Sequence, residues 1–425
     1  MKKIILTTLG SLGDLHPFIA IALALKQRGL HPVLGVPEDV VAKTQAAGLE
    51  AFAATPSFET ILARLQLPLE VAMQRLIDER NFLLENLVLP WLGESARALD
   101  GVADGARALV GSALMFAAPM IAENYNIPFI PAVLQPASLY SAYDPPRIPE
   151  FRIMHGAPVG ALGLGWNRLL YALIRRSLRR RYAPVIDALR VAHGLAPANQ
   201  AILLDPGRTP AFNLGCYSAL FAPLPPDAPP GTLLAGFPLF DSFSGQSEVL
   251  EPALDLFLAA GPPPIVFTLG SVMVRAAGAF YAQAAEVAAR LGRRAVLLTG
   301  HEATAIPPRD DLFVTQYAPH SALFPRAAII VHHGGVGTTG QALRAGKPQF
   351  VVPHILDQFD HGLRIAGLGV GASLTAKKFG VAAAQAQLAH LLQNPNTRQE
   401  AARLGALLQA ENGAQVAAAA IEAVI

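Results

Sequence analysis

The stretch Val331-His332-His333-Gly334-Gly335-Val336-Gly337-Thr338-Thr339 carries the strongest structural signal of the chain. An apolar run over 327–331 precedes it and a segment of helical character over 338–345 follows it, so the pattern predicts a strand, a tight loop and a helix N-terminus. The first turn of such a helix leaves backbone N–H groups unpaired, and glycines let an anion approach the backbone closely. The sequence therefore predicts a phosphate site at this strand-to-helix turn.

Outward from this turn, strands and helices alternate in two similar halves. The expected strands are 3–8, 31–36, 108–111, 128–133, 264–269, 295–298, 312–315, 327–331 and 349–352. The expected helices are 15–28, 39–47, 115–125, 276–291 and 338–345. Alternation of this kind indicates parallel sheets that are covered on both faces. The predicted fold class is α/β, with two doubly wound, Rossmann-like domains that face each other across a cleft.

The domain boundaries follow from length and from proline content. A chain of 425 residues exceeds what one hydrophobic core usually supports, and a proline-rich stretch at 222–231 separates the two halves. We expect an N-terminal domain over 1–225, a linker over 226–241 and a C-terminal domain over 242–410. A last helix is expected over 411–425, and it could return to the N-terminal domain.

The composition argues against several classes of protein. A net charge of +2, without an aromatic-interleaved basic stripe, argues against nucleic-acid binding. The single cysteine, Cys216, fits a reducing cytoplasm. The apolar run after Lys2 and Lys3 ends at Leu9, which is too short for a signal peptide, and we expect no membrane span. Because neither an Asp-x-Asp pair nor a Cys/His cluster of zinc spacing occurs, we expect no metal ion and no cofactor.

Four motifs in this order resemble the family 1 glycosyltransferases of the GT-B fold. They are Gly10-Ser-Leu-Gly-Asp-Leu-His-Pro17, Tyr317-Ala-Pro-His320, His332-His-Gly-Gly-Val-Gly-Thr-Thr339 and Pro353-His-Ile-Leu-Asp-Gln358. The resemblance covers nearly the whole chain and is greatest to bacterial sterol and antibiotic glucosyltransferases. The segments 237–241 and 357–360 also resemble the rhamnosyltransferase of rhamnolipid synthesis. The resemblance implies an inverting, metal-independent transferase with the acceptor in the N-terminal domain and the nucleotide-sugar in the C-terminal one.

The same resemblance implies a set of donor contacts. It places His332 and the backbone after it on the diphosphate, with Ser271 as a second phosphate donor, whereas His333 is expected to be a packing residue. The nucleobase is expected beside Tyr317 and Ala318. Asp357 and Gln358 would bind sugar hydroxyls, although Ser271 and Asp357 could instead cap helices. Plant members have a ribose-binding glutamate where this chain has Gly340. The implied donor-binding residues are Ser271, Tyr317, Ala318, His332, Gly335, Val336, Gly337, Thr338, Asp357 and Gln358.

Two residues in the first motif are candidates for the catalytic base. Asp14 and His16 follow the first expected strand, at the carboxyl edge where sites form in such sheets. We favour Asp14, although a carboxyl pKa of about 3.9 is low for a base and Asp14 could simply cap the next helix. His16 is the substitute, with Asp104 or Glu123 as an orienting carboxylate.

The expected acceptor is a hydrophobic molecule that carries a hydroxyl group. Apolar candidates to contact it are Phe82, Met115, Phe116 and Tyr140. The donor is expected to be UDP-glucose or dTDP-rhamnose, and the acceptor a lipid, a terpenoid or sterol, or a polyphenol. A UDP-sugar epimerase and a non-catalytic nucleotide-sugar binder remain alternatives. An NAD-dependent oxidoreductase is a weaker one, because Gly10-x-x-Gly13 lacks the third glycine of that fingerprint.

One dense basic run stands outside these motifs. It consists of Arg175, Arg176, Arg179, Arg180 and Arg181. On a helix these charges predict a solvated face. The alternative is contact with anionic lipid head groups next to the apolar stretch 166–174, which would make a cytoplasmic protein peripheral at the inner membrane.

Overall fold

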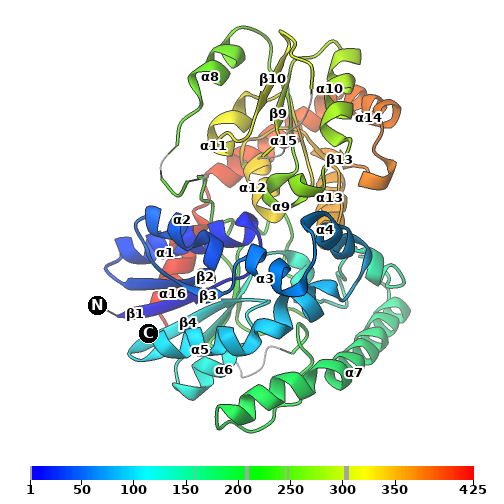
Figure 1. The fold of residues 1–425 in the computed structure, drawn as a ribbon. Coiled ribbons are helices and arrows are strands. Elements are labelled where there is room, and N and C mark those ends of the chain that lie inside the picture. Colours follow the sequence, from blue (N-terminus) through cyan, green and yellow to red (C-terminus); the bar gives the residue numbers. More distant parts are fainter. Residues whose placement is uncertain (1, 158, 206–209, 243, 247, 301–305) are drawn as a thin grey trace.

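The computed structural model describes residues 2–157, 159–205, 210–242, 244–246, 248–300 and 306–425. Two parallel sheets form two domains, each with helices on both faces of its sheet (Figure 1). This architecture confirms the predicted pair of doubly wound α/β domains.

The first sheet has seven strands in the order β3-β2-β1-β4-β5-β6-β7, all of them parallel. The strands are β1 (Lys3–Thr7), β2 (His31–Pro37), β3 (Glu50–Thr55), β4 (Ala106–Ser112), β5 (Phe129–Val133), β6 (Asn213–Gly215) and β7 (Thr232–Leu234). The strand order reverses between β1 and β4, so the loop after β1 lies at the switch point of this sheet.

The helices of this half are α1 (Leu12–Gln27), α2 (Val41–Ala46), α3 (Phe58–Leu65), α4 (Leu69–Asp78), α5 (Leu92–Ala103), α6 (Ala118–Asn124) and α7 (Ala161–Ala192). Helix α1 starts at a capping box, in which the Ser11 hydroxyl accepts from Gly13 N–H and the Asp14 carboxylate accepts from Ser11 N–H. Its apolar face is buried against the sheet. Helix α7 runs along the outside of this domain (Figure 1).

The second sheet has six parallel strands in the order β10-β9-β8-β11-β12-β13. The strands are β8 (Ile265–Thr268), β9 (Ala295–Leu298), β10 (Leu312–Thr315), β11 (Ile329–His332), β12 (Gln349–Val351) and β13 (Gly371–Ser373). The order reverses between β8 and β11, so the loops after these two strands flank the switch point.

The remaining helices are α8 (Pro252–Ala259), α9 (Gly270–Met273), α10 (Phe280–Arg290), α11 (His320–Leu323), α12 (Val336–Arg344), α13 (Gln358–Gly367), α14 (Val381–Gln393), α15 (Pro395–Gln409) and α16 (Gly413–Glu422). Short 3-10 turns are η1 (Glu38–Val40), η3 (Leu89–Trp91), η4 (Pro136–Leu139), η5 (Pro149–Phe151), η6 (Val274–Ala276), η7 (Phe324–Arg326) and η8 (Ala376–Lys378), and η2 (Leu83–Val88) is π-helical.

Two segments near the domain boundaries pack on the first domain. The stretch 226–241, expected as a linker, contributes the edge strand β7 to the first sheet, so the expected boundary at 225 is too early. Helix α16 packs against α1, and its Ala417, Ala418 and Ile421 are buried in the core of the first sheet. The chain therefore ends on the domain in which it begins (Figure 1).

Candidate functional site

The two domains approach each other at their switch points. The N–H of Leu12, in the first turn of α1, donates to the Ser271 hydroxyl in the second domain at 3.3 Å. A methyl group added at Gly337 would lie 3.6 Å from the Cα of Gly13. The N-termini of α1 and α12 thus face each other across the space between the sheets, where doubly wound folds bind their ligands.

The two helix N-termini differ in how their N–H groups are used. Side chains of Ser11 and Ser271 accept from the first N–H groups of α1. Helix α12 begins at Gly335 without a side-chain cap, and its first backbone bond runs from Thr339 N–H to the Gly335 carbonyl. No described residue accepts from the N–H groups of positions 336–338. This turn therefore offers free donors and a favourable dipole to an anion. Val336 adds only its backbone, because its side chain is buried in an apolar cluster.

The two histidines of the turn lie in opposite environments. His332 is fully buried, its Nε2 lies 2.9 Å from the Gln349 amide oxygen, and its Nδ1 accepts from Gly334 N–H at 3.1 Å. Both ring nitrogens are therefore occupied, which contradicts the expected contact between the His332 ring and a phosphate. The alternation of side chains along β11 could have indicated this, because His332 shares a face with the core residue Ile330.

His333, expected to be a packing residue, lies between the loops after β8 and β11. A methyl group at Gly335 would lie 2.4 Å from its Nε2, and one at Gly270 would lie 2.5 Å from its Cε1. Its Nδ1 has no hydrogen-bond partner among the described residues. Burial holds the pKa of His333 well below its ordinary value. The ring is thus neutral and can offer a hydrogen bond at the switch point.

Tyr317 and Ala318 lie at the side of the second domain near the connection between the domains. The Tyr317 hydroxyl donates to the Asp241 carboxylate at 3.1 Å, and the same carboxylate accepts from Ser321 N–H. The side chain of Ala318 is buried in the core, so only its backbone can face a ligand. Asp241 lies in the segment that connects the two domains, and its hydrogen bonds tie this segment to the residues that follow β10.

Asp357 occupies the N-cap position of α13, but its side chain does not cap the helix. Its carboxylate makes no capping hydrogen bond, and it lies 3.5 Å from Nδ1 of His361. Burial raises its pKa above the ordinary value. The Gln358 side chain makes hydrogen bonds within the protein. Its amide oxygen accepts from the N–H groups of His354 and Ile355, which fixes the preceding turn. Sequence reasoning missed His361, although its place four residues after Asp357 was a signal.

Asp14 is half-buried, and one of its two carboxylate oxygens caps the start of α1. Its Oδ2 accepts from the Ser11 N–H at 2.7 Å and from the Ser11 hydroxyl at 3.0 Å, so Asp14 completes the capping box while Ser11 is the cap itself. Burial raises its pKa to about 6, and the Asp357 charge acts in the same direction. No described residue hydrogen-bonds its Oδ1. Asp14 is therefore a stronger base than an ordinary carboxylate.

His16 is half-buried as well and is a weaker base. Burial, followed by the Lys43 charge, lowers its pKa to about 3, and its ring packs edge-on against Phe240 at 5.3 Å. The carboxylates expected to orient it are elsewhere: Glu123 pairs with Arg190, and Asp104 ends α5 at the opposite edge of the sheet. Burial thus reverses the ordinary order of basicity between Asp14 and His16.

The four expected acceptor residues are separated by the fold. Phe82 and Met115 are buried in two different apolar clusters, and their contact with an acceptor stays a prediction. Phe116 is half-buried beside the second of these clusters. Tyr140 is near the cleft: burial and the Asp357 charge raise its pKa to about 12, and its ring contacts those of Phe151 and Tyr171. Tyr140 is the member of the set that lies close to Asp357.

Two further features bear on the chemistry. Within the described ranges, no group of three His, Cys, Asp or Glu side chains is arranged to hold a metal ion. No described helix combines the length and the apolar character needed to cross a membrane.

The chain is similar to known proteins over most of its length. The family described as Erythromycin biosynthesis protein CIII-like, C-terminal domain, matches residues 284–423. Glycosyltransferase GtfE of Amycolatopsis orientalis is 30% identical over 377 residues, covering 87% of this chain and 85% of that protein. The O-mycaminosyltylonolide 6-deoxyallosyltransferase of Streptomyces fradiae is 30% identical over 426 residues, covering 99% and 97%. The solved structure of spinosyn rhamnosyltransferase SpnG complexed with thymidine diphosphate has a TM-score of 0.65 at 17% identity and covers both chains completely.

The sequence similarity shows the family, and the two facing parallel-sheet domains have the architecture of the structural neighbour. The chain belongs to the family 1 glycosyltransferases of the GT-B fold, enzymes that take a sugar from a nucleotide diphosphate-sugar donor.

Proposed function

We propose that this enzyme transfers a hexose from a UDP- or dTDP-sugar to a hydroxyl group of a hydrophobic small molecule, with inversion and without a metal ion. The observation that carries the proposal is the meeting of an uncapped helix N-terminus with a carboxylate of raised pKa at one cleft. The first can hold a diphosphate leaving group, and the second can accept a proton from the attacking hydroxyl.

The donor diphosphate is assigned to the start of α12. Its charge would be met by the N–H groups of Gly337 and Thr338, by the neutral ring of His333, and by the hydroxyl of Ser271 in the first turn of α9. Fixed donors of this kind stabilise charge that develops as the glycosidic bond breaks, and they need no reorganisation at that moment. His332 supports this turn from inside and does not touch the donor.

The base is assigned to Asp14. As the acceptor oxygen bonds to the anomeric carbon, its proton passes to Oδ1 of Asp14 while the bond to the diphosphate breaks on the opposite side. One displacement of this type inverts the anomeric centre. A carboxyl pKa near 6 matches neutral pH better than an ordinary aspartate does, which favours general-base catalysis.

The sugar and the acceptor are assigned to the edge formed by α13 and the Tyr140 region. Asp357 would accept hydrogen bonds from sugar hydroxyls, while the Gln358 side chain fixes the preceding turn through the N–H of His354. Tyr140 and Phe116 offer apolar surface to the acceptor. The thymidine diphosphate complex of the structural neighbour supports dTDP as one of the two carriers.

Thermal melting with dTDP, UDP and NAD tests the donor assignment. A ligand at about a hundred times its dissociation constant adds roughly 2.7 kcal/mol of stability, which is easily measured. We expect a shift with dTDP or UDP that is reduced in His333→Gln. A shift with NAD alone would mean that the phosphate turn serves an oxidoreductase.

Turnover distinguishes a transferase from the other candidates. We expect dTDP-rhamnose or UDP-glucose to be consumed only when a hydroxylated hydrophobic acceptor is present, and the product to be a glycoside of inverted configuration. Donor binding without consumption would indicate a non-catalytic binder, and conversion of the sugar without an acceptor would indicate an epimerase.

A further inference from the structure

The outer face of α7 carries an exposed apolar stripe. Leu162, Leu169 and Leu173 are 93%, 52% and 56% exposed, and Trp166 is 44% exposed. The Trp166 indole donates to the carbonyl of Ile153, which is itself 61% exposed. At 100° per residue, the four helix positions lie within about 60° of one another around α7. They form a continuous apolar patch on the outside of the molecule.

Farther along α7, the face that carries the apolar stripe becomes basic. Arg176 and Arg180 follow Leu173 by three and seven residues and therefore share its face. In the part of the chain that the structure describes, neither has an ion-pair partner. The other arginines of the run are paired internally: Arg175 and Arg179 with Asp205, both at 2.8 Å, and Arg181 with Glu85. Three arginines of the run are thus paired within the chain, and the two that share the face of the apolar stripe are not.

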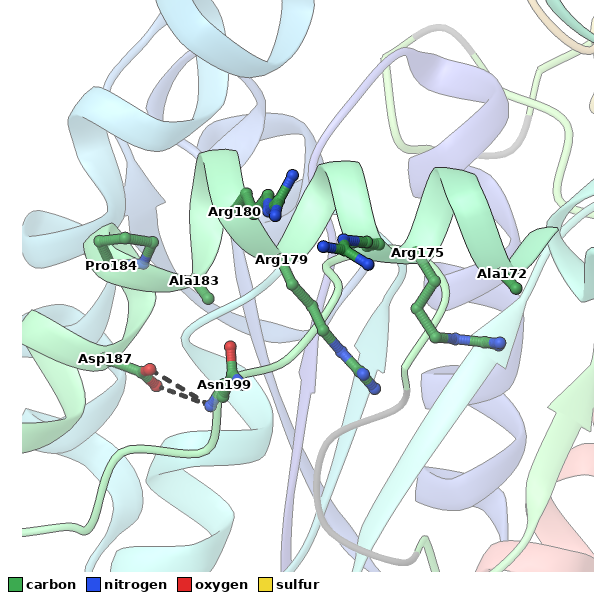
Figure 2. Close-up of a pocket in the computed structure, with 9 residues that line it drawn as sticks. Ala172, Arg175, Arg179, Arg180, Ala183, Pro184, Asp187 and Asn199 are labelled. Carbon is green, nitrogen blue, oxygen red and sulfur yellow. Dashed lines mark hydrogen bonds between the residues drawn. The ribbon is translucent and has the colours of Figure 1, made fainter. Parts of the chain in front are cut away.

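A shallow hollow lies along this part of the helix. Figure 2 shows Arg175, Arg179 and Arg180 among the side chains that line it. At one end of the hollow, the Asp187 carboxylate accepts hydrogen bonds from the Asn199 N–H. Arg176 also lines it, and it borders a second hollow with Arg180 and Leu173. Guanidinium groups gathered in this way bind phosphate oxygens well.

We propose that the outer face of α7 docks this enzyme on the surface of an anionic lipid bilayer. The helix would lie in the plane of the interface, with Leu162, Trp166 and Leu169 among the acyl chains and Arg176 and Arg180 on lipid phosphates. A second copy of the chain is a poorer occupant, because Asp187, the carboxylate at this hollow, already accepts hydrogen bonds from the N–H groups of Ala198 and Asn199. The proposal stands independently of which sugar or acceptor the enzyme uses.

Co-sedimentation of the full chain with vesicles tests the proposal. We expect binding to phosphatidylcholine vesicles that contain phosphatidylglycerol, and weak binding to phosphatidylcholine alone. Binding to the anionic vesicles falls as salt is raised, because the arginine contribution is screened. The absence of binding to anionic vesicles at low salt would overturn the proposal.

Two double variants separate the charge from the apolar stripe. Arg176→Gln with Arg180→Gln is expected to weaken binding about 25-fold, since each basic residue near an anionic surface contributes a factor of about five. Leu169→Gln with Leu173→Gln is expected to weaken binding to both vesicle types. Matched controls at exposed positions of the second domain are Arg293→Gln with Arg398→Gln and Val249→Gln with Leu256→Gln, which should leave binding unchanged.

The melting shift produced by dTDP or UDP verifies that each variant is folded, and it is expected to be the same as in the wild-type chain. Equal vesicle binding by the wild type and both α7 variants would overturn the proposal. So would a wild-type dimer in solution that Leu169→Gln with Leu173→Gln converts to a monomer, because the stripe would then be a self-association face.

Discussion

The guanidinium of Arg364, on α13 of the second domain, lies 2.8 Å from the carboxylate of Asp144 in the first. Arg364 also lies 2.6 Å from the fully buried Asp360, which accepts in turn from the Arg147 N–H at 3.1 Å. These groups join the domains beside Asp357, the residue that precedes α13. The position of Asp357 relative to Asp14 therefore depends on this ion cluster.

Removal of the arginine from this cluster should strongly destabilise the enzyme. Arg364→Met leaves the buried carboxylate of Asp360 without a counter-charge, and breaking a buried pair in this way costs about 3–5 kcal/mol. Urea denaturation measures the loss. As a control, Arg403→Met breaks only an exposed pair with Glu400 and should not change the midpoint measurably. Equal midpoints for the two variants would contradict the assignment of the cluster as a joint between domains.

The two histidines of the phosphate turn should affect different properties. His332→Ala leaves Gly334 N–H and the Gln349 amide buried without partners, at about 1–3 kcal/mol for each group. His333→Gln should leave the urea midpoint nearly unchanged and reduce the melting shift with dTDP or UDP. Measuring the midpoint and the shift on both variants separates stability from binding. The opposite pattern, with donor binding lost in a stable His332→Ala, would return the phosphate contact to His332.

The sequence predicts well those features that a local pattern encodes. The glycine turn at 334–337 and the alternation of strands and helices place the switch-point loops, because strand and helix periods are properties of a few neighbouring residues. The edge strand β7 carries no such signal, since it has three residues and follows a proline-rich stretch. Its place in the sheet is set by pairing with β6.

The orientation and acidity of site residues depend on distant contacts instead. The choice between His332 and His333 is made by Gln349 on the neighbouring strand β12, which takes one ring nitrogen of His332. The pKa of Asp14 is set by burial in the cleft, and in part by Asp357 of the second domain. Neither effect can be read from the residues next to the motif, so the sequence could propose Asp14 as the base but could not predict its pKa.

The rate of transfer should depend on the charge state of Asp14. With a pKa of about 6, Asp14 is ionised and basic above that pH and protonated below it. We expect kcat/KM to fall about tenfold per pH unit below pH 6 and to level off above it. Asp14→Asn should abolish turnover and retain the melting shift with dTDP or UDP. A pH profile without an inflection near 6, or a turnover that survives the substitution, would remove Asp14 from the role of base.

Folding stability should report the same pKa independently of turnover. Burial raises the pKa of Asp14 in the folded chain to about 6, while the unfolded chain titrates near 3.9. Between these values the folded state binds more protons, so the Asp14 contribution to stability is lost as pH rises from about 4 to about 6 and is constant above that. Asp14→Asn lacks this titration and keeps a side-chain oxygen for the Ser11 cap. Its free energy of unfolding should therefore gain on the wild type by at most about 3 kcal/mol across that window. Urea titrations at pH 4, 5, 6 and 7 measure the difference, and the exposed Asp310→Asn controls for the change in net charge. A difference that does not vary with pH would mean that Asp14 ionises at its ordinary value and that burial in the cleft leaves its charge unaffected.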